Sequence, residues 1–330
     1  MIFEKSPESF VVEEILKPRI NGGKFQYYVL EKTGIDSPNA IKILEKENDA
    51  PVYFCGFKDA QATTRQWICS LAELNEPADA RLRLEYKGKS DQKIFVGMHE
   101  SNKFTIKLGK VSEAEKKFLK TGLKKTAFPN YFDEQRLGEK SVELGLALAA
   151  QEWEKAAKIA LAKSFEYESE KSVQIKILIS RSWGKWDELA ANEEIPQSKR
   201  NIFIELAKGI EFKKACLLLE PKTLSISCRA AQAHMFNVAL KGQIEKQKVR
   251  NQKQIDIGKE IVPVLFSVKG VKREIAIGPI YPKSTKLKRK TYFVLQKTKL
   301  SFKGSDCTLE FILKKGCYGT VAIKCIMAIA

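Results

Sequence analysis

The stretch GFKDAQATTRQ, residues 56–66, is the part of the sequence that decides the fold. It follows the apolar run PVYFC at residues 51–55, whose β-branched and aromatic residues predict a buried strand. Gly56 is expected to let the backbone turn at the strand end without a Cβ clash. The stretch then carries one carboxylate, Asp59, among cationic, hydroxyl and amide side chains. Such a loop on a rigid strand is typical of a catalytic site, and a solvated turn in which Asp59 caps a following helix is the alternative.

The charge balance points to a polyanionic partner. The chain has 330 residues, with 58 lysines and arginines against 40 acidic residues, and its formal net charge is +18. Nucleic acids are the first expected partners and anionic membranes the second, while a merely solvated basic surface is the alternative. Interleaved aromatic residues favour RNA, because rings beside cationic side chains suit splayed bases.

Other classes of protein are disfavoured. No stretch approaches the roughly 20 consecutive apolar residues that span a bilayer, and acidic residues near the start interrupt any signal-peptide core. The seven cysteines form no Cys-x-x-Cys pair, and His99 and His234 are far apart, so no zinc cluster is expected. We therefore expect a cytoplasmic protein with no metal, no nucleotide cofactor and no membrane partner.

The chain divides by composition into a strand-rich start, a helical middle and a strand-rich end. Strand patterns are found early at residues 25–30, 81–86 and 104–108. Ser37 and Pro38 are expected to cap and open the first helix.

The helical middle begins with residues 143–162, which predict one long alanine- and leucine-rich helix. Strand patterns return from residue 255 onward. This order suggests an inserted domain rather than two domains in tandem. The basic run KSTKLKRK, residues 283–290, is predicted to lie at the junction, where a groove for a folded RNA would form, and a solvated linker is the alternative.

Several motifs together carry a resemblance to one family. Read as Gly-x-Lys-Asp-x-x-Ala-x-Thr-x-Gln, residues 56–66 resemble the signature of the TruD family of tRNA pseudouridine synthases, whose aspartate is the nucleophile. FVVEE at residues 10–14 resembles the family's Phe-x-Val-x-Glu opening, and NKF at residues 102–104 its Asn-x-Phe element. PNYFDEQRLG at residues 129–138 and GCYGTV at residues 316–321 are similar to two further blocks, so the resemblance spans essentially the whole chain.

The resemblance implies an α+β fold, in which a pseudouridine synthase core with a mixed, largely antiparallel sheet is interrupted by an inserted α+β TRUD domain. Residues 1–140 and 287–330 are then predicted to form the catalytic core, and residues 141–286 the inserted domain. The implied activity is the isomerisation of a uridine in tRNA, position 13 of the D-arm, to pseudouridine. Separately, we expect the protein to act as a monomer. A basic RNA-binding or RNA-chaperone protein that keeps the fold without turnover is the alternative.

This reaction requires one ionised carboxylate and neither a metal nor a redox cofactor, because it only moves the glycosidic bond from N1 to C5 of the base. Asp59 is the candidate nucleophile, and in a largely dry pocket its charge needs a cation or hydrogen-bond donors. Lys58 is adjacent, but on extended backbone its side chain would point to the opposite face. Lys5, one position away from the place where the family carries a lysine, is the candidate charge partner.

The target base must leave its RNA stack, so the pocket needs an apolar face and polar partners for the base edge. By resemblance, Phe10, Asn102 and Tyr318 match the substrate-binding positions, and Phe104 takes the place of an aromatic that stacks near the aspartate. The alternative for Phe10 and Phe104 is ordinary strand core. Lys58 and Arg136, which lie in two of the matching motifs, complete the predicted substrate contacts.

Overall fold

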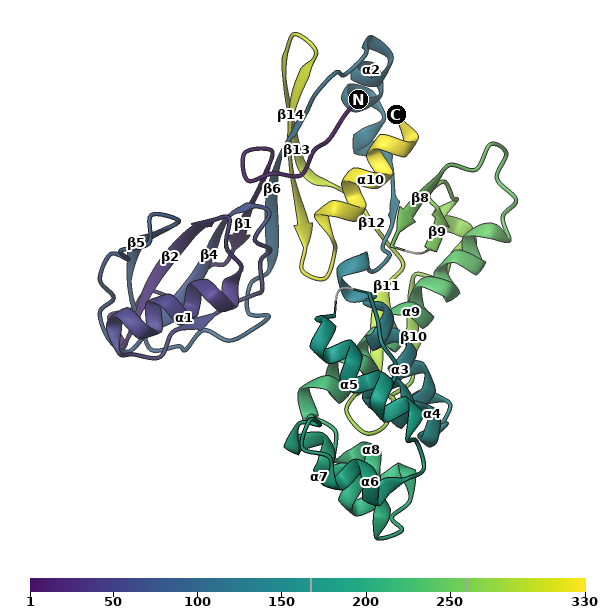
Figure 1. The fold of residues 1–330 in the computed structure, drawn as a ribbon. Coiled ribbons are helices and arrows are strands. Elements are labelled where there is room, and N and C mark those ends of the chain that lie inside the picture. The colour runs from purple at the N-terminus through teal and green to yellow at the C-terminus, as the bar shows by residue number, and fades with distance from the viewer. Residues whose placement is uncertain (167, 259) are drawn as a thin grey trace. The chain divides into compact units, whose positions relative to one another are not determined.

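The structure is a computed structural model that describes residues 1–166, 168–258 and 260–330, drawn in Figure 1. It separates into two compact units. Unit 1 consists of Met1–Phe128 and Tyr292–Ala330, and unit 2 of Pro129–Thr291. The division that we predicted at residues 140/141 and 286/287 falls inside unit 2, where residue 140 belongs to helix α3 (Glu139–Ala149) and residue 287 begins strand β11 (Leu287–Lys290).

Unit 1 is built on an eight-stranded sheet with the order β13-β14-β6-β1-β4-β2-β5, and β3 pairs with β4 beside this path. The strands are β1 (Phe10–Ile15), β2 (Phe25–Thr33), β3 (Tyr53–Phe54), β4 (Thr63–Ser70), β5 (Leu82–Ser90), β6 (Ser101–Leu108), β13 (Gln296–Lys303) and β14 (Asp306–Lys314). The β1–β4 pair is parallel and the other described pairs of this sheet are antiparallel. The predicted α+β class with a mixed, largely antiparallel sheet is confirmed.

Helices cover the sheet of unit 1. Helix α1 (Ser37–Asn48) lies against the sheet (Figure 1) and buries Ala40, Ile41 and Leu44 against strands β2, β4 and β5. Helix α10 (Gly319–Ile329) begins in direct contact with β6, because a Cβ on Gly319 would lie only 2.4 Å from Phe104 Cε1. The remaining elements of this unit are α2 (Glu113–Thr121), η1 (Leu123–Lys125) and β12 (Tyr292–Phe293). Strand β12 pairs with β7 (Phe128–Pro129), which spans the boundary between the units.

Unit 2 is mainly helical. Its helices after α3 are α4 (Trp153–Leu161), α5 (Glu170–Arg181), α6 (Trp186–Ala191), α7 (Gln197–Ala207), α8 (Phe212–Leu217) and α9 (Pro221–Glu245). Its short elements are η2 (Glu134–Arg136), β8 (Gln254–Ile257), β9 (Glu260–Pro263), η3 (Val268–Gly270) and β10 (Glu274–Ile277). The long helix predicted over residues 143–162 is wrong: Gln151 adopts a left-handed φ of 59°, which ends α3 and starts α4.

The basic run at residues 283–290 is not a linker throughout, because β11 pairs antiparallel with β10. Within it Arg289 is buried, and its guanidinium lies 3.9 Å from the Phe132 ring. The same guanidinium donates hydrogen bonds to the backbone oxygen and the side-chain oxygen of Asn130, at 3.0 and 2.8 Å. Lys286, Lys288 and Lys290 are exposed. Because side chains alternate along a strand, Arg289 points inward and has a structural role, whereas the exposed lysines can contact solvent or a polyanion.

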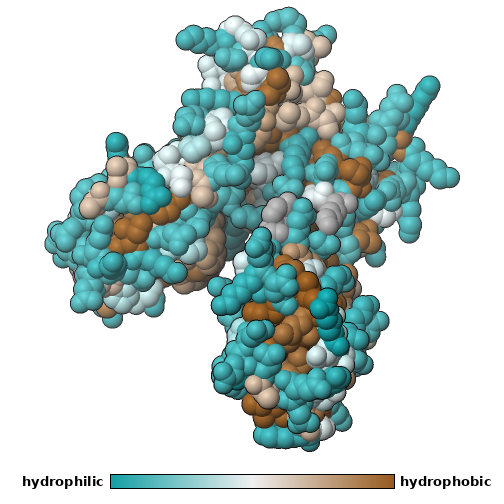
Figure 2. All heavy atoms as spheres, viewed as in Figure 1, coloured by the Kyte–Doolittle hydropathy of each residue, from teal (hydrophilic) through white to brown (hydrophobic). Residues whose placement is uncertain are grey.

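Hydrophilic side chains cover most of the surface that Figure 2 displays, as the high charge content requires. None of the helices in the described ranges combines the length and the apolar character that a membrane span needs.

Candidate active site

Asp59 lies on a loop, residues 55–62, which connects the antiparallel partners β3 and β4. We call this segment the Asp59 loop. It leads into a strand, so the alternative that Asp59 caps a following helix is wrong. Because both ends of the loop are held by pairing in a sheet, Asp59 is presented from a rigid base.

The carboxylate of Asp59 is paired with Lys5. The Lys5 Nζ lies 2.9 Å from Asp59 Oδ2, and the two side chains are 24% and 31% exposed. The same ammonium lies 5.2 Å from the centroid of the Phe10 ring on β1. The candidate nucleophile thus sits beside a cation and an aromatic ring at a half-exposed position, which a substrate can reach.

Lys58 points away from this pair. Its Nζ lies 2.5 Å from Glu14 Oε1, and Glu14 Oε2 accepts a hydrogen bond of 2.9 Å from the backbone N–H of Trp67. Burial raises the pKa of Glu14, against the opposing effect of Lys58. A Cβ on Gly56 would lie 3.0 Å from Glu14 Oε1, so the close approach of this side chain favours glycine here, although its φ is not positive. These contacts favour a structural role for Lys58 over the substrate contact predicted from the sequence.

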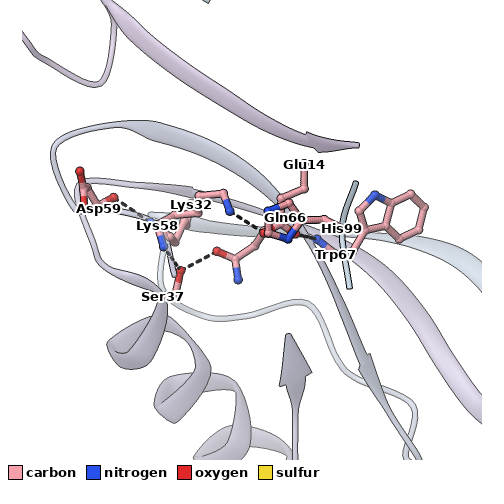
Figure 3. Close-up of polar contacts among 8 residues, drawn as sticks. All are labelled: Glu14, Lys32, Ser37, Lys58, Asp59, Gln66, Trp67 and His99. Carbon is pink, nitrogen blue, oxygen red and sulfur yellow. Dashed lines mark hydrogen bonds and ion pairs between the residues drawn. The ribbon is translucent and has the colours of Figure 1, made fainter. Parts of the chain in front are cut away.

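Ser37 also supports the loop, which the sequence did not indicate. Asp36, not Ser37, caps helix α1, because its side chain accepts from the backbone N–H of Asn39. The buried Ser37 hydroxyl instead donates to Gln66 Oε1 at 2.6 Å and accepts from the backbone N–H of Lys58 at 2.9 Å. The start of α1 is thereby tied to the Asp59 loop through Lys58 and to strand β4 through Gln66 (Figure 3).

Lys32 is the second residue that the sequence reasoning missed. It is fully buried, and its ammonium donates to the backbone oxygens of Asp59 and Ile35, at 2.9 and 2.6 Å. Burial lowers the pKa of Lys32 to about 8, against the attraction of Asp59 and Asp36. The signal was present in the strand alternation, because Lys32 follows the buried Tyr28 and Leu30 at a spacing of two along β2.

The imidazole of His99 is not a good acid or base for neutral conditions. Burial, Lys58 and Lys315 lower the pKa of His99 to about 4. The ring is therefore neutral near pH 7, and its Nδ1 lies 4.0 Å from Glu14 Oε1. Figure 3 draws His99 with Glu14 and Trp67, apart from the Asp59 carboxylate.

The predicted base-binding residues Phe104 and Asn102 differ in their packing and hydrogen bonding. Phe104 is buried, stacks on Phe311 with ring centroids 5.3 Å apart, and contacts Phe10 at 6.0 Å. This packing favours the core alternative for Phe104. Asn102 lies opposite Glu14 in the β1–β6 register, and its buried Oδ1 has no hydrogen-bond partner among the residues that the structure describes. Such an orphaned polar atom favours a ligand contact.

Two further predicted residues lie at element ends. Tyr318 is half-buried and directly precedes helix α10 in unit 1. Arg136 is exposed at the end of η2 and belongs to unit 2. The contacts of unit 1 therefore bring together Lys5, Asp59 and Phe10, with Phe104 packed against Phe10, whereas Arg136 is part of the other unit. In the described part of the chain, no three His, Cys, Asp or Glu side chains gather as a metal site would require.

The family model and the similar proteins all carry the same family name. A sequence model of the family described as tRNA pseudouridine synthase D (TruD) matches residues 1–259. The probable tRNA pseudouridine synthase D 1 of Methanococcus maripaludis is 30% identical over 73% of this chain and 66% of its own length. The probable tRNA pseudouridine synthase D 2 of Methanocaldococcus jannaschii is 30% identical over 74% and 61%. The match thus spans less than two thirds of the length of these two relatives.

Two other comparisons extend over nearly the whole chain. The probable tRNA pseudouridine synthase D of Nanoarchaeum equitans is 29% identical, and the match covers 98% of both chains. The crystal structure of a putative tRNA pseudouridine synthase D from Methanosarcina mazei superimposes with a TM-score of 0.65 over 98% of this chain and 93% of that one. At 18% identity, the latter comparison bears on the fold.

Proposed function

The chain belongs to the tRNA pseudouridine synthase D (TruD) family, and on that premise we propose that it converts a uridine of tRNA to pseudouridine, with U13 of the D-arm as the target. Its partner is then tRNA, it acts as a monomer in the cytoplasm, and it uses no cofactor. The observation that carries the proposal is the pairing of Asp59 with Lys5 on a loop held by the sheet.

The pairing suits the one group that this reaction requires. The Lys5 ammonium lies 2.9 Å from the Asp59 carboxylate and provides it with a direct counter-charge. The ring of Phe10, whose centroid lies 5.2 Å from the Lys5 ammonium, is buried and forms an apolar wall behind the charge pair. A charged carboxylate beside apolar surface is a stronger nucleophile than one in open water, because fewer water molecules solvate it.

The bond changes balance without a co-reactant. The C1′–N1 bond of the target uridine breaks, the base turns, and a new bond forms between C1′ and C5. The C5 hydrogen leaves as a proton and N1 gains one, so the product is an isomer. The Asp59 carboxylate either bonds covalently to the sugar or the base or stabilises a glycal-type intermediate. Both routes need this carboxylate ionised.

Asn102 suits recognition of the extruded base. Its side-chain amide belongs to β6, next to β1, and its buried oxygen accepts no hydrogen bond from any described residue. An amide can pair with the donor and acceptor edge of uracil, and an acceptor left unpaired in the free protein gains a hydrogen bond when the base enters. The net positive charge attracts the tRNA backbone as a whole.

The decisive experiment maps pseudouridine, by base-specific chemistry and sequencing, in tRNA incubated with the purified protein. We expect a new pseudouridine at position 13 and none in a tRNA in which that uridine is replaced by cytidine. A pseudouridine at another position would keep the activity and refute the target. If the protein binds tRNA but modifies no uridine, the RNA-chaperone alternative is correct instead.

A further inference from the structure

Lys32 occupies a position where a charged side chain is costly. It has no exposed surface, and strands β4 and β5 place the uncharged Thr64 and Leu82 opposite it. Lysine is among the residues least often found fully buried, because moving an ammonium out of water is unfavourable unless strong partners replace the water. The two partners here are the carbonyl oxygens of Asp59 and Ile35.

These two carbonyls define what the ammonium does. One belongs to the candidate nucleophile itself, and the other precedes helix α1. A single charged donor thus clamps the Asp59 loop to the segment between β2 and α1, from the interior side, as Figure 3 illustrates for Lys32 and Asp59. Fixing the backbone oxygen of Asp59 restricts the carboxylate to rotations about its own side-chain bonds. Charge-assisted hydrogen bonds of this kind are stronger than those of a neutral donor.

The other buried lysine of the described chain shows the contrast. Lys176 on α5 is 2% exposed and forms an ion pair with the carboxylate of Glu168. Lys176 therefore meets a counter-charge directly, whereas Lys32 donates to the main chain of the loop that carries Asp59.

We infer that Lys32 is a positioning residue, whose buried ammonium holds the backbone of the Asp59 loop and adds a second positive charge near the Asp59 carboxylate. The inference rests on the proposed function, because it assigns Lys32 to the chemistry of that site. Lys5 then provides the direct ion pair from the half-exposed side, and Lys32 the anchor from the interior.

A dependence on pH follows from the same geometry. The charged groups that act on Lys32 are Asp59, Asp36 and Lys58, and with burial they leave its pKa at about 8. Above pH 8 the amine loses its proton and the clamp weakens, so turnover should fall. Fold stability should move the other way: the unfolded chain binds more protons than the folded one between about pH 8 and 10.5, so the titration of Lys32 increases stability as pH rises.

The first test replaces Lys32 by methionine, with Lys176→Met as the matched loss of a buried ammonium in the other unit. We expect Lys32→Met to lower the single-turnover rate at pH 7 by about 100-fold while its tRNA affinity stays within about threefold of the parent. Lys176→Met should leave the rate within about threefold. A Lys32→Met protein that converts uridine at the parental rate would overturn the inference.

The second test follows the pH dependence of the parent protein and compares it with a variant that keeps the charge. In the parent protein the single-turnover rate should decline with a midpoint near pH 8, without a fall in melting temperature. Lys32→Arg, whose guanidinium keeps its charge throughout this range, should lack that decline. A rate that is flat from pH 7 to 9, or the same decline in Lys32→Arg, contradicts the assignment.

A third measurement is independent of turnover. Hydrogen exchange of peptides covering residues 56–62, in the protein without RNA, should be faster in Lys32→Met than in the parent and unchanged in Lys176→Met. Unchanged exchange in Lys32→Met overturns the positioning role even if the protein proves to have no isomerase activity. Conversely, the parent protein could lack turnover while Lys32→Met still exchanges faster than the parent. That result would refute the proposed function but support the positioning role of Lys32.

Discussion

The ammonium of Lys5 and the carboxylate of Asp59, which lie 54 positions apart in the sequence, form an ion pair of 2.9 Å. Lys5 precedes strand β1 and Asp59 precedes strand β4, and β1 and β4 are the parallel pair of the sheet. Because parallel strands begin at the same edge, residues that precede them meet there. The parallel pairing therefore explains how this charge pair is assembled.

Asp59→Asn should abolish pseudouridine formation while tRNA affinity stays within a few-fold of the parent. The amide keeps the size of the side chain but cannot act as the nucleophile. The measurement is single-turnover conversion of a defined tRNA together with equilibrium binding. Conversion by Asp59→Asn at a rate comparable to the parent would remove Asp59 from the mechanism.

Lys5→Met should lower the single-turnover rate by about 100-fold, because the Asp59 carboxylate loses its direct counter-charge. The melting temperature should hardly change, since an ion pair between partners that are about a quarter to a third exposed contributes only about 0–1 kcal/mol. Lys5→Arg retains the charge and should recover part of the rate. Equal activity of the methionine and arginine variants would show that the charge of Lys5 is unimportant.

Replacing Lys286, Lys288 and Lys290 together by glutamine should weaken tRNA binding and flatten its salt dependence. If all three contact phosphates, the slope of log K against log salt should decrease in magnitude by roughly two to three units. Binding titrations at several salt concentrations measure this slope. A slope identical to that of the parent would mean that these exposed lysines are merely solvated.

Arg289→Met should instead destabilise unit 2 by about 3 kcal/mol in the free energy of unfolding. The substitution removes the guanidinium from the Phe132 ring and leaves the buried Asn130 oxygens without their donor. Urea unfolding measures the difference, and the triple lysine variant is the control, with an expected change below about 0.5 kcal/mol. Equal stabilities of the two variants would contradict the structural role of Arg289.

Turnover should survive exhaustive chelation without any added cofactor. A single carboxylate is sufficient for the isomerisation, and the Asp59–Lys5 ion pair consists of one carboxylate and one cation rather than a set of metal ligands. The tRNA should be held folded by monovalent salt during the assay, because magnesium can support RNA folding. Activity that is lost on chelation and restored by a transition metal, but not by magnesium, would contradict the single-aspartate mechanism.

The sequence by itself determined the fold class, the family and the candidate nucleophile. Strand alternation at residues 25–30, 81–86 and 104–108 is a local signal, because side chains point to alternate faces at a period of two. The apolar run at residues 51–55 was a weaker guide, because it forms only the two-residue, half-buried strand β3. The motif around Asp59 is equally local, since its residues lie within eleven consecutive positions. Local patterns of this kind can be recognised without any knowledge of the tertiary structure.

Only the tertiary structure decided which residues act on one another. From the sequence we expected Ser37 to cap a helix and the basic run that contains Arg289 to face RNA. In the structure the Ser37 hydroxyl instead accepts a hydrogen bond from the Asp59 loop, and Arg289 is buried beside Phe132. Lys32 was overlooked although its alternation along β2 marked it as an inward-facing residue. The physical reason is that burial, pKa and hydrogen-bond partners depend on groups from distant parts of the chain, and these meet only when the strands pair in a particular order.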